Sequence, residues 1–127
     1  MKLRLIAAVT LLVISIGAAV GCVLHLGRCA DDLSGALQAA LASGANQPPE
    51  EWKPATDEVM LLWSRDKEFM HVLLPHVNLT ELEWALGSLP EYQKEGERAL
   101  YVEQCVRSLQ CVDTVKEMER LTWGNVF

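Results

Sequence analysis

Hydrophobic and polar residues divide the chain into two unequal parts. From Leu5 to Leu26 the sequence contains no Asp, Glu, Lys or Arg, and a helix of about 22 residues is long enough to cross a hydrocarbon core of about 30 Å. Beyond Arg28, apolar residues recur at helical spacing among many charged ones, which is typical of helices that bury one face. The pattern therefore predicts a membrane-spanning helix followed by a water-exposed helical domain.

The apolar segment is best interpreted as an uncleaved signal anchor, because it exceeds the core of about 7–15 residues found in ordinary signal peptides. Lys2 and Arg4 precede it, so the positive-inside tendency places the N-terminus in the cytoplasm and the residues after Arg28 outside. Two alternatives stay open. A cleaved signal peptide would use the small residues 17–19, and a lipoprotein signal would use residues 19–22 as an imperfect lipobox.

Helices are predicted throughout the rest of the chain, because sustained period-two alternation and hairpin turns are absent from the sequence. The first covers residues 30–42 and ends before the breaker-rich residues 44–49. The second begins near residues 50–56 and ends at Pro75. Its apolar face comprises Val59, Leu62, Trp63, Phe69, Met70, Leu73 and Leu74.

The third helix is expected to begin at Asn78. Thr80 and Glu83 have the spacing of a capping box, and Leu79 and Trp84 have the spacing of a hydrophobic staple. That interpretation places Trp84 in the core with Leu82, Leu86 and Leu89. The helix is expected to bend or end around Pro90, before a turn at residues 94–96.

The fourth helix is expected over residues 97–121. Its predicted buried stripe comprises Val102, Cys105, Val106, Leu109, Val112 and Val115. The fold class is thus all-α. A transmembrane anchor (residues 1–28) precedes an extracytoplasmic domain (residues 29–127) of about four short antiparallel helices. Helix pairs recur at a spacing near 34 residues, which permits a tetratricopeptide-like stack as well as an irregular bundle.

The net negative charge of the chain argues against a nucleic-acid-binding function. The chain has a formal charge of −6, and nucleic-acid binding needs a basic face instead. Three of the 11 basic residues lie at or before Arg28, and all 17 acidic residues lie beyond it. The exported part therefore carries 8 basic against 17 acidic residues, a formal charge of −9. Such a domain would be repelled by an anionic membrane surface.

The four cysteines are Cys22, Cys29, Cys105 and Cys111, and no two of them form a CxxC pair. Cys105 and Cys111 are six residues apart on one predicted helix, a rise of about 9 Å that exceeds disulfide reach. Free, buried thiols are the favoured interpretation.

Candidates for chemistry are few. Glu68 and His71 have the Glu-x-x-His spacing of di-iron bundles, but those sites need two such pairs and two further glutamates. His76 follows Pro75 at a helix junction, where it is expected to satisfy backbone groups. Asp66 and Glu68 are expected to be solvated. No metal, cofactor or enzymatic activity is therefore predicted.

Four tryptophans are the most distinctive feature of the exported part. Trp63 and Trp84 fall on predicted core stripes. Trp52 and Trp123 flank helices and are expected, together with Phe127, to be exposed anchors for a protein partner.

From Trp63 onward the sequence resembles the membrane-anchored bacterial family called domain of unknown function 4363. The resemblance lies in residues 63–68, in His76 before a helix start at residues 78–83, and in the ending at residues 125–127. Pro90, the cysteines and the low lysine content depart from the family pattern. The resemblance implies an architecture and a membrane location, and it implies no reaction.

The sequence therefore predicts a single-pass cell-membrane protein with its C-terminal domain outside. That domain is expected to be an interaction or accessory module for another membrane or envelope protein. The alternative is an exported domain that binds a small ligand or a metal through Glu68, His71 and His76.

Overall fold

The computed structural model describes the backbone of residues 1–126, and the side chains in that range except those of residues 122, 123, 125 and 126. The elements are α1 (Lys2–Asn46), a short 3-10 helix η1 (Pro49–Glu51), α2 (Lys53–Leu73), α3 (His76–Glu95) and α4 (Arg98–Val126). The described part of the chain contains no strand. The all-α fold class is confirmed.

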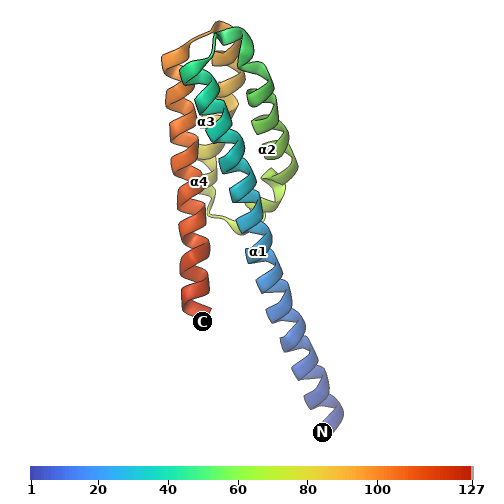
Figure 1. Ribbon diagram of the computed structural model, residues 1–127. Helices are drawn as coiled ribbons and strands as arrows, with labels where there is room; N and C mark the ends of the chain where they lie inside the picture. The colour runs from blue at the N-terminus through green and yellow to red at the C-terminus, as the bar shows by residue number, and fades with distance from the viewer. Residues whose placement is uncertain (127) are drawn as a thin grey trace.

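The first helix is one continuous element. A separate helix at residues 30–42 is predicted from the sequence, and this is wrong, because α1 runs through 45 residues from the apolar segment into the bundle. No proline interrupts it, so the hydrogen-bond ladder continues. At about 1.5 Å per residue α1 is about 67 Å long, and its N-terminal half projects from the other helices (Figure 1).

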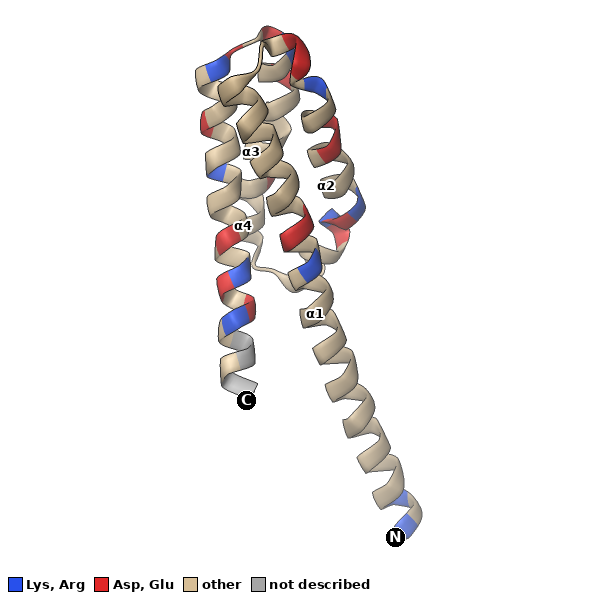
Figure 2. Cartoon of the chain, in the orientation of Figure 1, with Lys and Arg blue, Asp and Glu red and all other residues tan. Residues whose placement is uncertain are grey.

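The projecting half of α1 is apolar and uncovered. Residues 1–19 are all exposed, and Leu26 is the first buried residue of the helix. Charged residues cover the bundle but are missing from the projecting half except near its N-terminus (Figure 2). By length and composition α1 is able to cross a membrane, a property that signal sequences share.

The C-terminal half of α1 forms a four-helix bundle with α2, α3 and α4 (Figure 1). α1 contacts α2 and α4, and α3 contacts the same two helices. The first and last helices thus lie side by side and close the bundle around one core. That core includes Leu33, Leu37, Val59, Trp63, Met70, Leu82, Leu86, Leu89, Tyr101, Cys105 and Val112.

The distal end of the bundle, away from the N-terminus of α1, is held by polar contacts around Trp52. The Trp52 ring stacks on Tyr101 at 4.8 Å between centroids, and its Nε1 donates to the carbonyl of Gln47 at 3.1 Å. The Arg98 guanidinium lies over the same ring and donates to the carbonyls of Gly44 and Gln47. These carbonyls belong to the end of α1, where helices lack internal donors.

The proximal end of the bundle contains the connection from α2 to α3. α2 ends at Leu73, Leu74 is extended, and α3 begins at His76 directly after Pro75. The predicted start at Asn78 is therefore wrong by about one half turn. The Thr80 hydroxyl bonds the His76 carbonyl at 2.9 Å, so it lies inside the helix and caps nothing.

α3 and α4 differ from expectation at three further points. One is the end of α4, which continues to Val126 instead of ending at residue 121. α3 continues through Pro90 and ends at Glu95, and its cap Gly96 has a φ of 68°, the left-handed conformation that glycine adopts freely. The predicted turn is present at Gly96, but Lys94 and Glu95 still belong to the helix. The predicted end of the helix around Pro90 is wrong, and the alternative of a bend there stays a prediction. In α4, Cys105, Val112 and Val115 are buried as predicted, whereas Val106 is exposed because it lies about 100° around the helix from Cys105.

Candidate functional site

The three tryptophans with described side chains lie in very different places. Trp52 is 0% exposed, so the expectation that it is a surface anchor is wrong. It fills the distal end of the core, where its ring nitrogen has a backbone partner. Trp63 is 5% exposed, which confirms its predicted core position. Trp84 is 78% exposed, so its predicted place in the core is wrong.

Trp84 is exposed because it lies on the face of α3 opposite the buried residues. With His76 as the first helical residue, residues 79–84 are all helix interior, and no staple geometry applies to Leu79 and Trp84. The buried face of α3 passes through Leu82 and Leu86. Trp84 is two residues from each, about 200° around the helix, so it points away from the core.

A groove of about 370 Å³ runs beside Trp84 between α3 and α4. Its lining residues are Glu81, Trp84, Ala85, Ser88 and Tyr92 from α3, and Gln104 and Arg107 from α4. The α3 residues recur at spacings of three and four, which places them on one stripe of the helix. The groove is thus built from two rigid helices rather than from loops.

The groove combines aromatic surface with both signs of charge. Trp84 and Tyr92 supply apolar area with hydrogen-bonding atoms, and such residues, with arginine, are enriched at protein interfaces. Arg107 lies 3.6 Å from Glu103, and both side chains are about half exposed. Exposed pairs of this kind are weak, so the guanidinium is able to exchange Glu103 for a carboxylate of a partner.

A second polar cluster lies between α1 and α2. Asp66 accepts hydrogen bonds from Arg65 Nε at 2.9 Å and Nη2 at 3.0 Å, and Arg65 Nη2 also reaches Asp32 of α1 at 3.3 Å. The side chain of Asp66 is only 6% exposed, so its expected solvation is wrong. The Arg65 guanidinium holds the pKa of the Asp66 carboxyl below its usual value.

Cys29 adjoins this cluster but is not set up as a nucleophile. Its Sγ lies 3.6 Å from His25 Nε2. Burial, with the nearby Asp66 carboxylate, raises the pKa of the Cys29 thiol to about 11. Cys29 therefore stays a protonated thiol at neutral pH. It is not a nucleophile in that form, because only the thiolate is nucleophilic. Burial likewise raises the pKa of Cys105 to about 12. All four cysteines are free, and the predicted burial is confirmed for Cys29 and Cys105.

The residues of the metal-binding alternative lie on the surface. Glu68, His71 and His76 are all exposed, and the His71 ring lies 6.4 Å from that of Trp63. Among the described residues, no group of three or more His, Cys, Asp or Glu side chains is arranged to hold a metal ion.

Two of the predicted partner-binding residues fall outside the description. The side chain of Trp123 and the whole of Phe127 are not among the described residues.

The sequence nevertheless contained the signals that were missed. Asp66 follows Trp63 by three residues and precedes Met70 by four, so it lies on the core stripe of α2. Trp84 could have been placed on the surface from its two-residue separation from Leu82 and Leu86. The groove itself had no sequence signal, because it depends on how α3 and α4 pack.

Comparison of the chain with protein-family models, with curated proteins and with solved structures finds no match.

Proposed function

We propose that this chain is a membrane-anchored, extracytoplasmic interaction module that binds another membrane or envelope protein through the groove beside Trp84. It acts by binding rather than by catalysis. α1 tethers the bundle to the membrane, and the α3–α4 face meets the partner. This role also agrees with the layout implied by the resemblance to the domain of unknown function 4363 family.

The observation that carries the proposal is the exposure of Trp84. A tryptophan that is 78% exposed leaves a large apolar ring in water, whereas Trp52 and Trp63 are buried in the same bundle. Tryptophans placed centrally on a surface with a polar rim are frequent hot spots of protein interfaces. Glu81, Gln104 and Arg107 supply such a rim around the groove.

The proposed topology follows from α1. Its projecting half offers an uncovered apolar surface, and Lys2 and Arg4 lie at its start. We infer a single pass through the cell membrane with the bundle outside, since positive residues favour the cytoplasmic side. The antiparallel bundle is proposed in preference to a tetratricopeptide-like stack. The packing of α1 on α4 supports it, because units of a stack contact only their neighbours.

The proposal is tested by placing a photo-crosslinking amino acid at Gln104 in the full-length protein and irradiating the native membranes. We expect a discrete adduct with one membrane or envelope protein, and we expect Trp84→Ala to abolish it. The same crosslinker at Leu61, which is exposed on α2 and does not line the groove, is the matched control. A Gln104 adduct that survives Trp84→Ala, or the same adduct from Leu61, contradicts the proposed site.

A further inference from the structure

A second, larger groove lies where α1 leaves the bundle. It has a volume of about 580 Å³ and is lined by the last exposed turns of α1, by the α2–α3 connection and by α4. This size falls within the range of about 300–1,000 Å³ typical of small-molecule sites. Among the described residues, none that lines this groove also lines the α3–α4 groove beside Trp84.

The groove exists because two of the four helices stop before the others. α2 ends at Leu73 and α3 begins at His76, while α1 and α4 continue past that level (Figure 1). On α1 the lining residues Ala19, Val23 and Leu26 lie at spacings of four and three. They extend the same stripe that is buried inside the bundle at Ala30 and Leu33. The core stripe of α1 thus continues toward its N-terminus, past the level at which α2 and α3 cover it.

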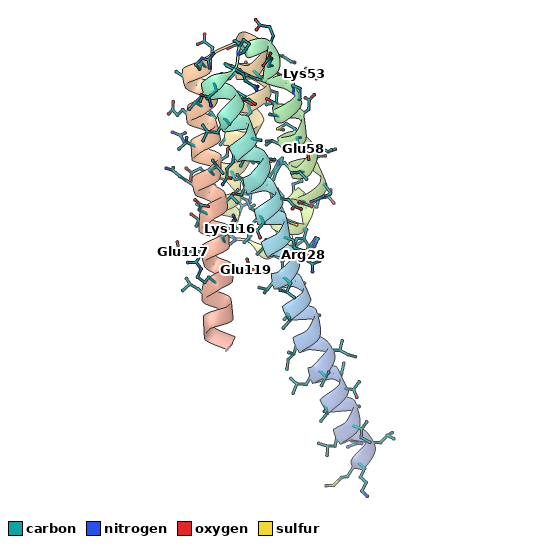
Figure 3. All side chains as sticks on the ribbon, viewed as in Figure 1. Arg28, Lys53, Glu58, Lys116, Glu117 and Glu119 are labelled. Atoms are coloured by element: carbon teal, nitrogen blue, oxygen red, sulfur yellow. The ribbon has the colours of Figure 1, made fainter. Side chains whose placement is uncertain are left out.

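The groove is apolar inside and polar at its upper rim. Within the described part of the chain, Glu119 is the one charged residue that lines it, and its carboxylate lies against Gly27 of α1. Just above, Lys116 pairs with Asp31 at 3.2 Å. Figure 3 shows Lys116 and Glu119 on the side of α4 that faces α1. An occupant therefore needs a polar head on the side of the bundle and an apolar body on the side of the N-terminal half of α1.

Exposed apolar side chains adjoin the lining residues of this groove along the chain. Val72 and Val77 flank the lining residues 73–75 and are 83% and 79% exposed. Leu24 follows the lining residue Val23, Leu121 lines the groove itself, and both are exposed. The opening is continuous with the uncovered apolar half of α1. A soluble domain rarely leaves so much contiguous apolar surface uncovered unless it is a membrane or partner contact.

We propose that this groove holds an acyl chain of a bilayer phospholipid, with its head group at the rim formed by Glu119, Lys116 and Asp31. The inference rests on the membrane placement of α1 in the proposed function. In that placement the opening faces the acyl chains of the leaflet nearest the bundle. The protein recognises the acyl chain of the lipid rather than its head group, because a domain with a formal charge of −9 does not attract anionic head groups.

The test reconstitutes the full-length protein in vesicles of phosphatidylcholine doped with a phosphatidylcholine that carries a photoactivatable diazirine in one acyl chain. Irradiation and peptide mass spectrometry then locate the labelled residues. We expect labelling at Leu74, which lines the groove and is otherwise buried, in addition to lipid-exposed residues of α1 such as Leu11.

Two neighbouring alanines provide the variant and its control. Ala19→Phe fills the groove, whereas Ala18→Phe lies on a part of α1 that does not line it. We expect Ala19→Phe to reduce the labelling of Leu74 at least about tenfold, equivalent to about 1.4 kcal/mol of lost affinity. Ala18→Phe should leave it unchanged. Both alanines are exposed, so neither variant disturbs the core.

The outcomes separate this inference from the proposed function. Labelling of Leu11 without Leu74 shows that α1 is in the bilayer and that the groove takes no lipid, which overturns the inference alone. Absence of labelling at both residues overturns the membrane placement as well. A crosslinked pair of chains joined through the groove shows that a second copy occupies it, which also overturns the lipid site.

Discussion

At the scale of single residues, Asp66 shows how a charge is kept inside this bundle. Its carboxylate is almost fully buried but receives two hydrogen bonds from Arg65, which itself stays about half exposed. Arg65 thus offsets the cost of burying the charge while its own head group remains hydrated. Through Asp32 the same guanidinium connects α2 to α1.

Asp66 should make the stability of the protein depend on acidity. Its pKa is lower in the folded state, so the unfolded state binds the proton more tightly. The contribution of Asp66 is therefore complete above its unfolded pKa, near about 3.9, and is lost as the pH falls through the lower folded pKa. We expect the free energy of unfolding, from denaturant titrations in detergent, to fall more between about pH 5 and pH 2 in the wild type than in Asp66→Asn.

At neutral pH the same substitution should cost about 1.5–3 kcal/mol, the range for hydrogen bonds to charged groups. Glu68→Gln, an exposed acid on the same helix, is the control and should change little. Parallel pH profiles for the wild type and Asp66→Asn would show that Asp66 is not responsible.

The tryptophans give a second prediction at this scale. Trp84→Ala should change the free energy of unfolding by less than about 0.5 kcal/mol, as for surface positions. Trp63→Ala should cost about 3–5 kcal/mol, because it empties a core position. Thermal or denaturant melts distinguish them. A large loss of stability in Trp84→Ala would mean that its ring is packed, and it would remove the basis of the proposed partner site.

At the scale of elements, α1 contains glycines with opposite requirements. A Cβ placed on Gly44 would lie 2.6 Å from Cδ1 of Tyr101, whereas one on Gly35 meets nothing within 4 Å. Gly44 therefore permits the close approach of α1 and α4 on which the distal end depends. The space beside Gly35 is open, so no close contact between helices depends on this glycine.

These two glycines form a matched pair for a helix-level experiment. Gly44→Ala should destabilise the protein by about 1–3 kcal/mol through overpacking against Tyr101. Gly35→Ala should stabilise it by up to about 1 kcal/mol, since alanine favours helix over glycine. Chemical denaturation of both variants beside the wild type measures the difference. Equal effects would show that α1 and α4 do not pack as closely as described.

At the scale of the whole molecule, sequence patterns predicted the helices better than their boundaries. The apolar segment followed from its lack of charged residues, and the core positions Trp63, Cys105 and Val112 followed from helical periodicity. The continuity of α1 did not, because the absence of a proline permits two helical segments to join but does not require it. The start of α3 was misplaced because Thr80 and Glu83 satisfy a capping pattern that the helix passes through. The staple inferred from that start also placed Trp84 in the core, although its two-residue separation from Leu82 and Leu86 puts it on the opposite face of the helix.

The candidate sites depend still more on assembly. Both grooves arise from the relative lengths and packing of helices: one from α3 against α4, the other from the early end of α2. Single residues on each could be predicted to lie on a helix face. Their convergence could not, because it requires the positions of elements that are distant in sequence.

The orientation of the whole molecule provides the last prediction. Lys2 and Arg4 precede the apolar segment, so the bundle should lie outside the cell. Gln38→Cys places a thiol on an exposed position of the bundle, and Leu3→Cys places one near the N-terminus. With the half-buried Cys22 and Cys111 replaced by alanine, only buried native thiols remain. A membrane-impermeant maleimide should then label Gln38→Cys on intact spheroplasts and Leu3→Cys only after lysis. The reverse pattern would place the bundle in the cytoplasm and contradict the proposed extracytoplasmic role.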